Sequence, residues 1–237
     1  MTLPDEIRSA CARVAGEARR VRIVDEAIDS YARTFPAEAP RSSDPVGETA
    51  EEQATHILTL NAINFGSGWF PTLRKAPGVS GFRTVEEGLR AHGPWSAAAL
   101  GSISAADVAH ALGQDPGHEL MGLFATHLRD LGRRVEGEHG GSFLALARSG
   151  EGSAVRLAER LAGWPTWRDV STYGGSRVPF FKRAQIVAAD LALAGVAPAR
   201  DLERLTMFAD NLVPHVLRVD GVLDFDPALV ARIEDGR

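Results

Sequence analysis

Cysteine is almost absent from this sequence of 237 residues, and so are long apolar segments. The single cysteine, Cys11, excludes an internal disulfide framework and any zinc site built from several cysteines. No apolar segment is long enough to span a bilayer, and residues 1–6 are acidic, without the apolar core of a signal peptide. We therefore expect a cytoplasmic protein that does not associate with membranes.

A large excess of charge of either sign is also absent. The chain has 26 Lys and Arg against 31 Asp and Glu, which gives a net charge of −5 and a pI of about 5.8. A surface that grips a nucleic-acid backbone is usually basic, so direct binding of nucleic acid is not expected. The sequence contains no glycine-rich phosphate loop and no HExxH, GxSxG or CxxC motif. Nothing in it indicates an oligomeric state.

Helical periodicity and helix-start signals account for most of the chain, and almost none of it reads as strand. Residues 4–18 and 22–35 predict two N-terminal helices, and Thr49 followed by Glu52 is a capping box that opens another. A small β-hairpin is compatible with the pair of glycines at 174–175. We predict an all-α fold that forms a single domain over residues 1–237.

The most informative segment, residues 179–194, is apolar on nearly all sides and predicts a helix in the middle of a bundle, with Pro179 at its first position. Lys182 and Arg183 lie in its first turn, where the helix dipole does not favour cations. They would be stabilised by a bound anion, since helix N-termini attract phosphates. A buried ion pair between Arg183 and Asp190 is the alternative, and the residues alone leave both open.

A lone carboxylate, Asp210, interrupts the apolar run at 205–217. Asp and Asn are preferred at helix N-caps, so Asp210 or Asn211 would cap a helix over 212–217. From the residues alone this capping role is favoured over a catalytic one.

Glycine, proline and aromatic residues are concentrated in residues 61–78. Aromatic side chains in a loop indicate either a binding wall or lid, or a loop that folds back to fill the core. Asn61 and Asn64 would supply hydrogen bonds in either case.

Four blocks of the sequence resemble, in order and spacing, the queuosine salvage protein family, which are queuosine 5′-phosphate N-glycosylases/hydrolases. The blocks are 140–144, 167–170, 177–190, and 205–210 together with 214–217, and residues 60–69 resemble an upstream block of the family. The resemblance covers residues 49–237, whereas the helices within residues 1–48 are compatible with the family but not diagnostic.

The resemblance implies a helical fold related to helical DNA glycosylases. It implies hydrolysis of the N-glycosidic bond of queuosine 5′-monophosphate to queuine and ribose 5-phosphate, a queuine salvage step that serves the queuosine modification of tRNA. The implied substrate is a small nucleotide, and neither a metal nor an organic cofactor is implied.

The resemblance also implies the roles of individual residues. Asp210 would stabilise the positive charge that develops on the ribose, attack it, or activate water. Phe208 would stack on the 7-deazaguanine ring, while Lys182 and Arg183 would hold the 5′-phosphate across one pocket from Asp210. The other expected substrate-binding residues are Asp190, Asn64, Phe65, Trp69 and His215.

The sequence departs from the family pattern at three places. Phe181 stands where the family often has tyrosine, and His215 where it often has glutamine. Family members continue well past the position of Ile233 with further acidic and aromatic residues, so the chain resembles a short form. The alternatives are a non-catalytic or drifted binder of a purine or deazapurine nucleotide, and a helical scaffold for tRNA or DNA, which the negative net charge disfavours.

Overall fold

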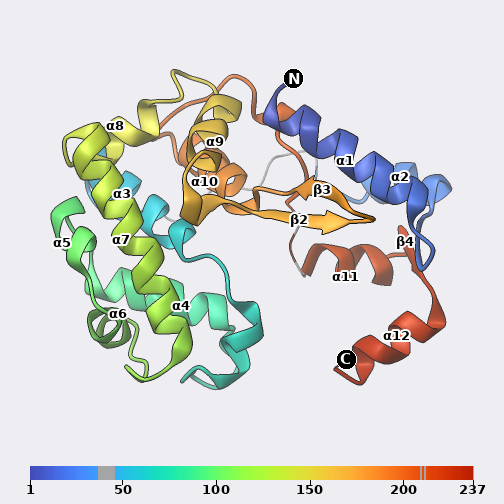
Figure 1. Ribbon diagram of the computed structural model, residues 1–237, viewed down its shortest axis with the longest axis horizontal. Helices are drawn as coiled ribbons and strands as arrows, with labels where there is room; N and C mark the ends of the chain where they lie inside the picture. The colour runs from blue at the N-terminus through green and yellow to red at the C-terminus, as the bar shows by residue number, and fades with distance from the viewer. Residues whose placement is uncertain (37–45, 209, 211, 237) are drawn as a thin grey trace. The chain divides into compact units, whose positions relative to one another are not determined.

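A computed structural model describes residues 1–36, 46–208, 210 and 212–236, and helices account for most of them (Figure 1). Strands occur in this part of the chain as two short antiparallel pairs. The predicted all-α class with one small hairpin is therefore confirmed. The chain divides into two compact units. Unit 1 comprises Met1–Arg41, Asp169–Lys182 and Arg204–Arg237, and unit 2 comprises Ser42–Arg168 and Arg183–Glu203. That the whole chain is one domain stays a prediction.

Unit 2 is organised around one long helix, α7 (Glu119–His139), which contacts α3, α5, α6 and α8 (Figure 1). Its buried side chains recur every three or four residues, so one face of the helix is in the core. The other helices of this unit are α3 (Ala50–Ala62), α4 (Gly81–His92), α5 (Ala97–Ser102), α6 (Ala105–Ala111), α8 (Phe143–Arg148), α9 (Ala154–Ala162) and α10, which begins in unit 1 (Lys182–Leu193). Short 3₁₀ helices are η1 (Ser67–Thr72), η2 (Pro165–Trp167) and η3 (Leu202–Arg204).

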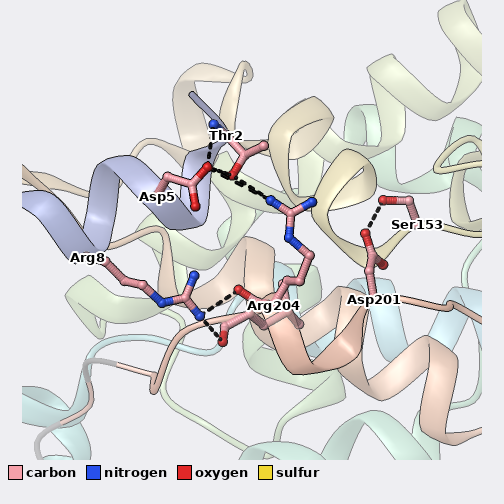
Figure 2. A network of polar contacts seen from close by, with 7 residues as sticks. Thr2, Asp5, Arg8, Ser153, Asp201 and Arg204 are labelled. Atoms are coloured by element: carbon pink, nitrogen blue, oxygen red, sulfur yellow. Dashed lines mark hydrogen bonds and ion pairs between the residues drawn. The ribbon is translucent and has the colours of Figure 1, made fainter.

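Helix starts in unit 2 follow from capping residues. The predicted box at α3 is present, because Glu52 N–H donates to Thr49 Oγ1 at 3.2 Å and Thr49 N–H donates to Glu52 Oε2 at 3.0 Å. Five further helices start after a serine whose hydroxyl accepts the N–H three residues on, namely Ser80, Ser96, Ser104, Ser142 and Ser153. Asp201 reinforces the last of these caps, since it accepts from the Ser153 hydroxyl and from Ala154 N–H (Figure 2).

Unit 1 combines helices with both strand pairs. Its elements are α1 (Leu3–Glu17), β1 (Val21–Ile23), α2 (Asp25–Ala32), β2 (Val170–Tyr173), β3 (Ser176–Pro179), α11 (Leu212–Val219), β4 (Leu223–Phe225) and α12 (Pro227–Glu234). Strands β2 and β3 form the predicted hairpin, and its two turn residues, Gly174 and Gly175, have φ of 55° and 77°. Positive φ at both turn residues is typical of a tight hairpin whose twist matches its strands. Helix α1 packs on β3, where Arg13 donates to the Arg177 carbonyl at 3.0 Å.

The prediction of one helix over residues 22–35 was wrong. Residues 21–23 form β1, which pairs antiparallel with β4, and the helix starts only at Asp25. Val24 N–H continues the interaction by donating to the Val222 carbonyl at 2.9 Å. The partner strand lies about two hundred residues away in the sequence, so local periodicity does not reveal it.

The predicted start of α10 at Pro179 was also wrong, because the helix begins at Lys182. Pro179 is the last residue of β3, paired with Val170. Between strand and helix, Phe181 has a φ of +49°, which interrupts any helix that runs through it. Within the described residues, no helix is both long enough and apolar enough to cross a membrane.

Helices α5 and α7 are in close backbone contact at Gly132. A Cβ at this position would lie 2.6 Å from the Ala97 carbonyl oxygen and would also meet the backbone nitrogen of Gly101. Both atoms belong to the α5 backbone, so neither can yield by rotating a side chain. The sequence therefore needs glycine here to bring the two helices together.

We expect Gly132→Ala to lower the free energy of unfolding by about 1–3 kcal/mol, because an added methyl group forces the two helices apart. Gly137 on the same helix is the matched control, since it is exposed and a Cβ there meets nothing within 4 Å. Gly137→Ala should raise stability by about 0.5–1 kcal/mol through helix propensity alone. Urea unfolding of both variants measures the difference, and equal effects would contradict the steric explanation.

Candidate functional site

An ion pair in unit 1 joins the start of α10 to the residues that precede α11. Lys182 Nζ lies 2.7 Å from Asp210 Oδ2, and the two side chains are only 17% and 28% exposed. The second carboxylate oxygen, Oδ1, accepts the Leu212 N–H at 2.8 Å. Asp210 therefore caps α11, as the residues alone favoured, and it also contacts a cation. Asn211, the other predicted cap, lies outside the described residues.

A cavity of about 490 Å³ in unit 1 has Asp210 in its wall. Among the described residues that line it, Asp210 carries the only charge, and almost all the others are apolar. Phe208 lines the same cavity, and its role as a base-stacking residue stays a prediction. A carboxylate in such surroundings interacts with a developing positive charge more strongly than it would in water.

The cavity has a second aromatic residue, Phe180, which the sequence did not predict as a site residue. Val178 and Phe180 both line it, because side chains two apart on an extended chain lie on the same side. The prediction of a helix from Pro179 concealed this extended arrangement, and residues 176–180 do not alternate between polar and apolar in a way that would have revealed it.

The first helix supplies another wall of this cavity through Cys11, Val14 and Ala15. Arg8, on the same helix, donates to the carbonyls of Arg204 at 2.9 Å and of Leu205 at 3.2 Å (Figure 2). These contacts hold α1 to the segment that leads to Phe208 and Asp210. The N-terminal helix is thus part of the candidate site.

The start of α1 also contacts the segment that begins at Arg204. The guanidinium of Arg204 donates to Thr2 Oγ1 at 3.3 Å and lies 3.9 Å from Asp5 Oδ2 (Figure 2). Asp5 in turn accepts from the N–H and hydroxyl of Thr2, which lowers the pKa of its carboxyl group. The start of α1 is therefore held by a charged network.

Arg183 is buried in unit 2, with 8% of its surface exposed. Its guanidinium donates to the carbonyls of Ala62, at 2.6 Å, and of Thr166. Its Cζ lies 5.0 Å from the ring centroid of Phe65 and 5.3 Å from that of Trp167. Carbonyl and ring contacts of this kind stabilise a desolvated cation. The role of Arg183 as a phosphate ligand stays a prediction.

His127 contacts the same guanidinium, with its Nδ1 3.2 Å from Arg183 Nη1. Because a guanidinium only donates, Nδ1 accepts and the ring proton lies on Nε2. Burial, and next the charge of Arg183, lower the pKa of His127 from 6.5 to about 4. The imidazole is therefore neutral at physiological pH.

The remaining predicted residues of unit 2 form polar and aromatic contacts of their own. Asn61 Nδ2 donates to Asp190 Oδ2 at 2.9 Å, and Asn64 Nδ2 donates to Asn61 Oδ1 at 3.2 Å. The half-buried carboxylate of Asp190 therefore has Asn61 as its hydrogen-bond partner. The ion pair between Arg183 and Asp190, which the sequence left open, is not needed to explain it. Burial raises the pKa of Asp190, and the hydrogen bond from Asn61 opposes that rise.

The aromatic residues of the 61–78 segment differ in their surroundings. Phe65 packs edge-on against Phe124, with ring centroids 5.2 Å apart, and its centroid lies 4.5 Å from that of His127. Trp69 is half-buried, and its Nε1 donates to Glu119 at 3.2 Å. Phe65 is half-buried and packs against the buried ring of Phe124, and the choice between the two alternatives for this segment stays a prediction.

The structure therefore groups the predicted residues as follows. Phe208 and Asp210 line one cavity of unit 1, Lys182 pairs with Asp210, and His215 is exposed on α11 in the same unit. The others, Arg183, Asp190, Asn64, Phe65 and Trp69, have the contacts described above within unit 2. In the described part of the chain, no three His, Cys, Asp or Glu side chains are grouped to hold a metal ion.

Comparison with known proteins identifies relatives. The family model described as "Queuosine salvage protein" matches residues 44–237. A protein of Sphaerobacter thermophilus is 33% identical over 93% of this chain and 74% of its own length. Proteins of Bos taurus and Nematostella vectensis are 30% and 27% identical, over 65% and 94% of this chain and 46% and 69% of their own lengths. All three are named queuosine 5′-phosphate N-glycosylase/hydrolase.

The lowered pKa of His127 makes the stability of the protein depend on pH. The unfolded chain takes up the proton near pH 6.5 and the folded protein only near pH 4. The free energy of unfolding should therefore be unaffected by this group above pH 6.5 and should fall as the pH falls from 6.5 to 4. His127→Gln keeps an acceptor for Arg183 but does not titrate, so its thermal midpoint should fall less over this range. Identical pH profiles of the two proteins would contradict the assignment.

Proposed function

Because the chain belongs to the queuosine salvage protein family, we propose that it hydrolyses the N-glycosidic bond of queuosine 5′-monophosphate. The products are queuine and ribose 5-phosphate. The observation that carries the proposal is the position of Asp210, which lies in the wall of an apolar cavity and is paired with Lys182 at 2.7 Å. Phe180 and Phe208 line the same cavity and offer aromatic surface to a base.

The reaction breaks the bond between C1′ of the ribose and the base nitrogen. Positive charge then develops on the ribose, water adds its oxygen to C1′, and the base leaves with a proton. A carboxylate held as an anion beside C1′ stabilises that charge or takes the proton from water. The Lys182 ammonium and the Leu212 N–H both favour the ionised form of Asp210, one at each oxygen.

Lys182 has a second use in this proposal. An ammonium has three donors, so it can keep its contact with Asp210 while it donates to the 5′-phosphate. Binding of the phosphate, a part of the substrate that does not react, would place C1′ next to the carboxylate. Lys182 thus links recognition of the monophosphate to the reacting centre.

The second candidate is a protein that binds a purine or deazapurine nucleotide without turnover. The observation in its favour is the same cavity, whose wall is aromatic and aliphatic with a single charged group among the described residues. In that case substitution of Asp210 would leave nucleotide affinity nearly intact.

Product analysis by HPLC tests the two candidates, with queuosine 5′-monophosphate, queuosine and GMP as substrates. We expect queuine to be released from the monophosphate alone. Asp210→Asn should lower kcat by about 10²–10³-fold, the usual effect of removing one electrostatic stabiliser of the transition state. Lys182→Gln should lower kcat/KM and reduce the preference for the monophosphate over queuosine.

Two matched controls are available. Asp220→Asn makes the same change at an exposed carboxylate at the end of α11, and Lys75→Gln does so at the other of the two lysines, which is also exposed. Both controls should keep wild-type activity. If no substrate releases a base, whereas queuosine 5′-monophosphate still raises the thermal midpoint of the protein, the binding candidate is favoured instead.

A further inference from the structure

Asp169 in unit 1 accepts three successive backbone N–H groups. Its carbonyl oxygen accepts from Phe180 at 2.9 Å and from Phe181 at 3.3 Å, and its carboxylate Oδ2 accepts from Lys182 at 3.0 Å. These residues form the corner where β3 has ended and α10 begins. The first N–H groups of a helix have no partner within the helix, so Asp169 caps α10 from thirteen residues away.

The corner has an unusual backbone conformation. Phe181 has a φ of +49° and its side chain is 4% exposed. A bulky residue is rarely found in the left-handed region, and such a conformation persists only where the surroundings hold it. Asp169 makes hydrogen bonds to Phe181 and to both of its neighbours, so it is the residue placed to hold this conformation.

The three side chains at this corner have different surroundings. Phe180 lines the cavity, Phe181 is buried, and Lys182 pairs with Asp210. Asp169 itself is not among the residues that line the cavity. Its influence on the candidate site therefore passes through the backbone of the residues that it holds.

We propose that Asp169 is a positioning residue for the hydrolysis proposed above, on which this inference rests. Its carboxylate sets the backbone of Lys182, and thereby the ammonium that contacts Asp210. Its carbonyl sets the ring of Phe180 at the cavity wall. Small displacements of groups that orient a substrate lower the rate of the chemical step far more than they weaken binding.

Two conservative variants separate geometry from charge at this position. Asp169→Asn keeps an acceptor oxygen in the same place and loses the charge, whereas Asp169→Glu keeps the charge and displaces the carboxylate by one methylene. Asn should retain most of the wild-type kcat, while Glu and Asp169→Ala should lower kcat by about 10–100-fold with a smaller change in KM. The reverse order, with Glu active and Asn inactive, would overturn the proposal.

Asp201→Ala is the control for a purely structural effect. Asp201 also accepts a backbone N–H at the start of a helix, from Ala154 at 2.7 Å, but it belongs to α9 in unit 2. Its loss should lower the thermal midpoint and leave kcat of the folded protein unchanged. If Asp169→Ala behaves in the same way, with lowered stability and unchanged kcat, the positioning role is wrong and the proposed function still stands.

Cys11 provides a readout that does not depend on turnover, because it is the chain's single cysteine and lines the cavity. Queuosine 5′-monophosphate should slow its alkylation by iodoacetamide in the wild type and in Asp169→Asn. In Asp169→Ala and Asp169→Glu, which remove or displace the carboxylate that holds the Lys182 N–H, more nucleotide should be needed for the same protection. If the wild type neither releases queuine nor is protected, the proposed function itself has failed, and the positioning role fails with it.

Discussion

Three consecutive backbone N–H groups, on Phe180, Phe181 and Lys182, depend on Asp169 for their acceptors. The ladder of β3 has ended and the hydrogen bonds of α10 have not begun, so the chain needs acceptors from elsewhere at this point. Once they are satisfied, a left-handed residue becomes tolerable, and the neighbouring side chains reach the cavity and Asp210. This corner supplies Phe180 to the cavity of unit 1 and Lys182 to the ion pair with Asp210.

In both units, a charged side chain that is removed from water needs polar or charged partners. Asp210 lies in an apolar cavity wall, and its two oxygens contact an ammonium and a helix N–H. Arg183 is buried among carbonyl oxygens, aromatic rings and a neutral histidine. Buried charges are stable only when such partners are supplied. The two adjacent cations at the start of α10 therefore have different environments: Arg183 is buried among the groups named above, and Lys182 contacts the candidate catalytic carboxylate.

Local sequence signals correctly predicted those structural features that are set by residues close together in the chain. The capping box at Thr49, the hairpin at Gly174–Gly175 and the predominance of helix are set by contacts a few residues apart, and all were found. The errors occurred where a distant partner decides the conformation. Residues 21–23 are extended because β4 pairs with them, and α10 starts late because Asp169 holds the preceding residues.

The sequence by itself determined the helical class, the family resemblance and, through it, the candidate residues Asp210, Lys182 and Phe208. Only the tertiary structure decided that Phe208 and Asp210 line one cavity and that Lys182 pairs with Asp210. It also decided that Phe180 and the first helix line this cavity, and that Asp169 holds the backbone of Phe180 and Lys182. The physical reason is that capping and periodicity are interactions between near neighbours in the chain. A cavity wall is a set of side chains brought together from distant segments, and whether a charge in that wall is stable depends on partners that no local pattern specifies.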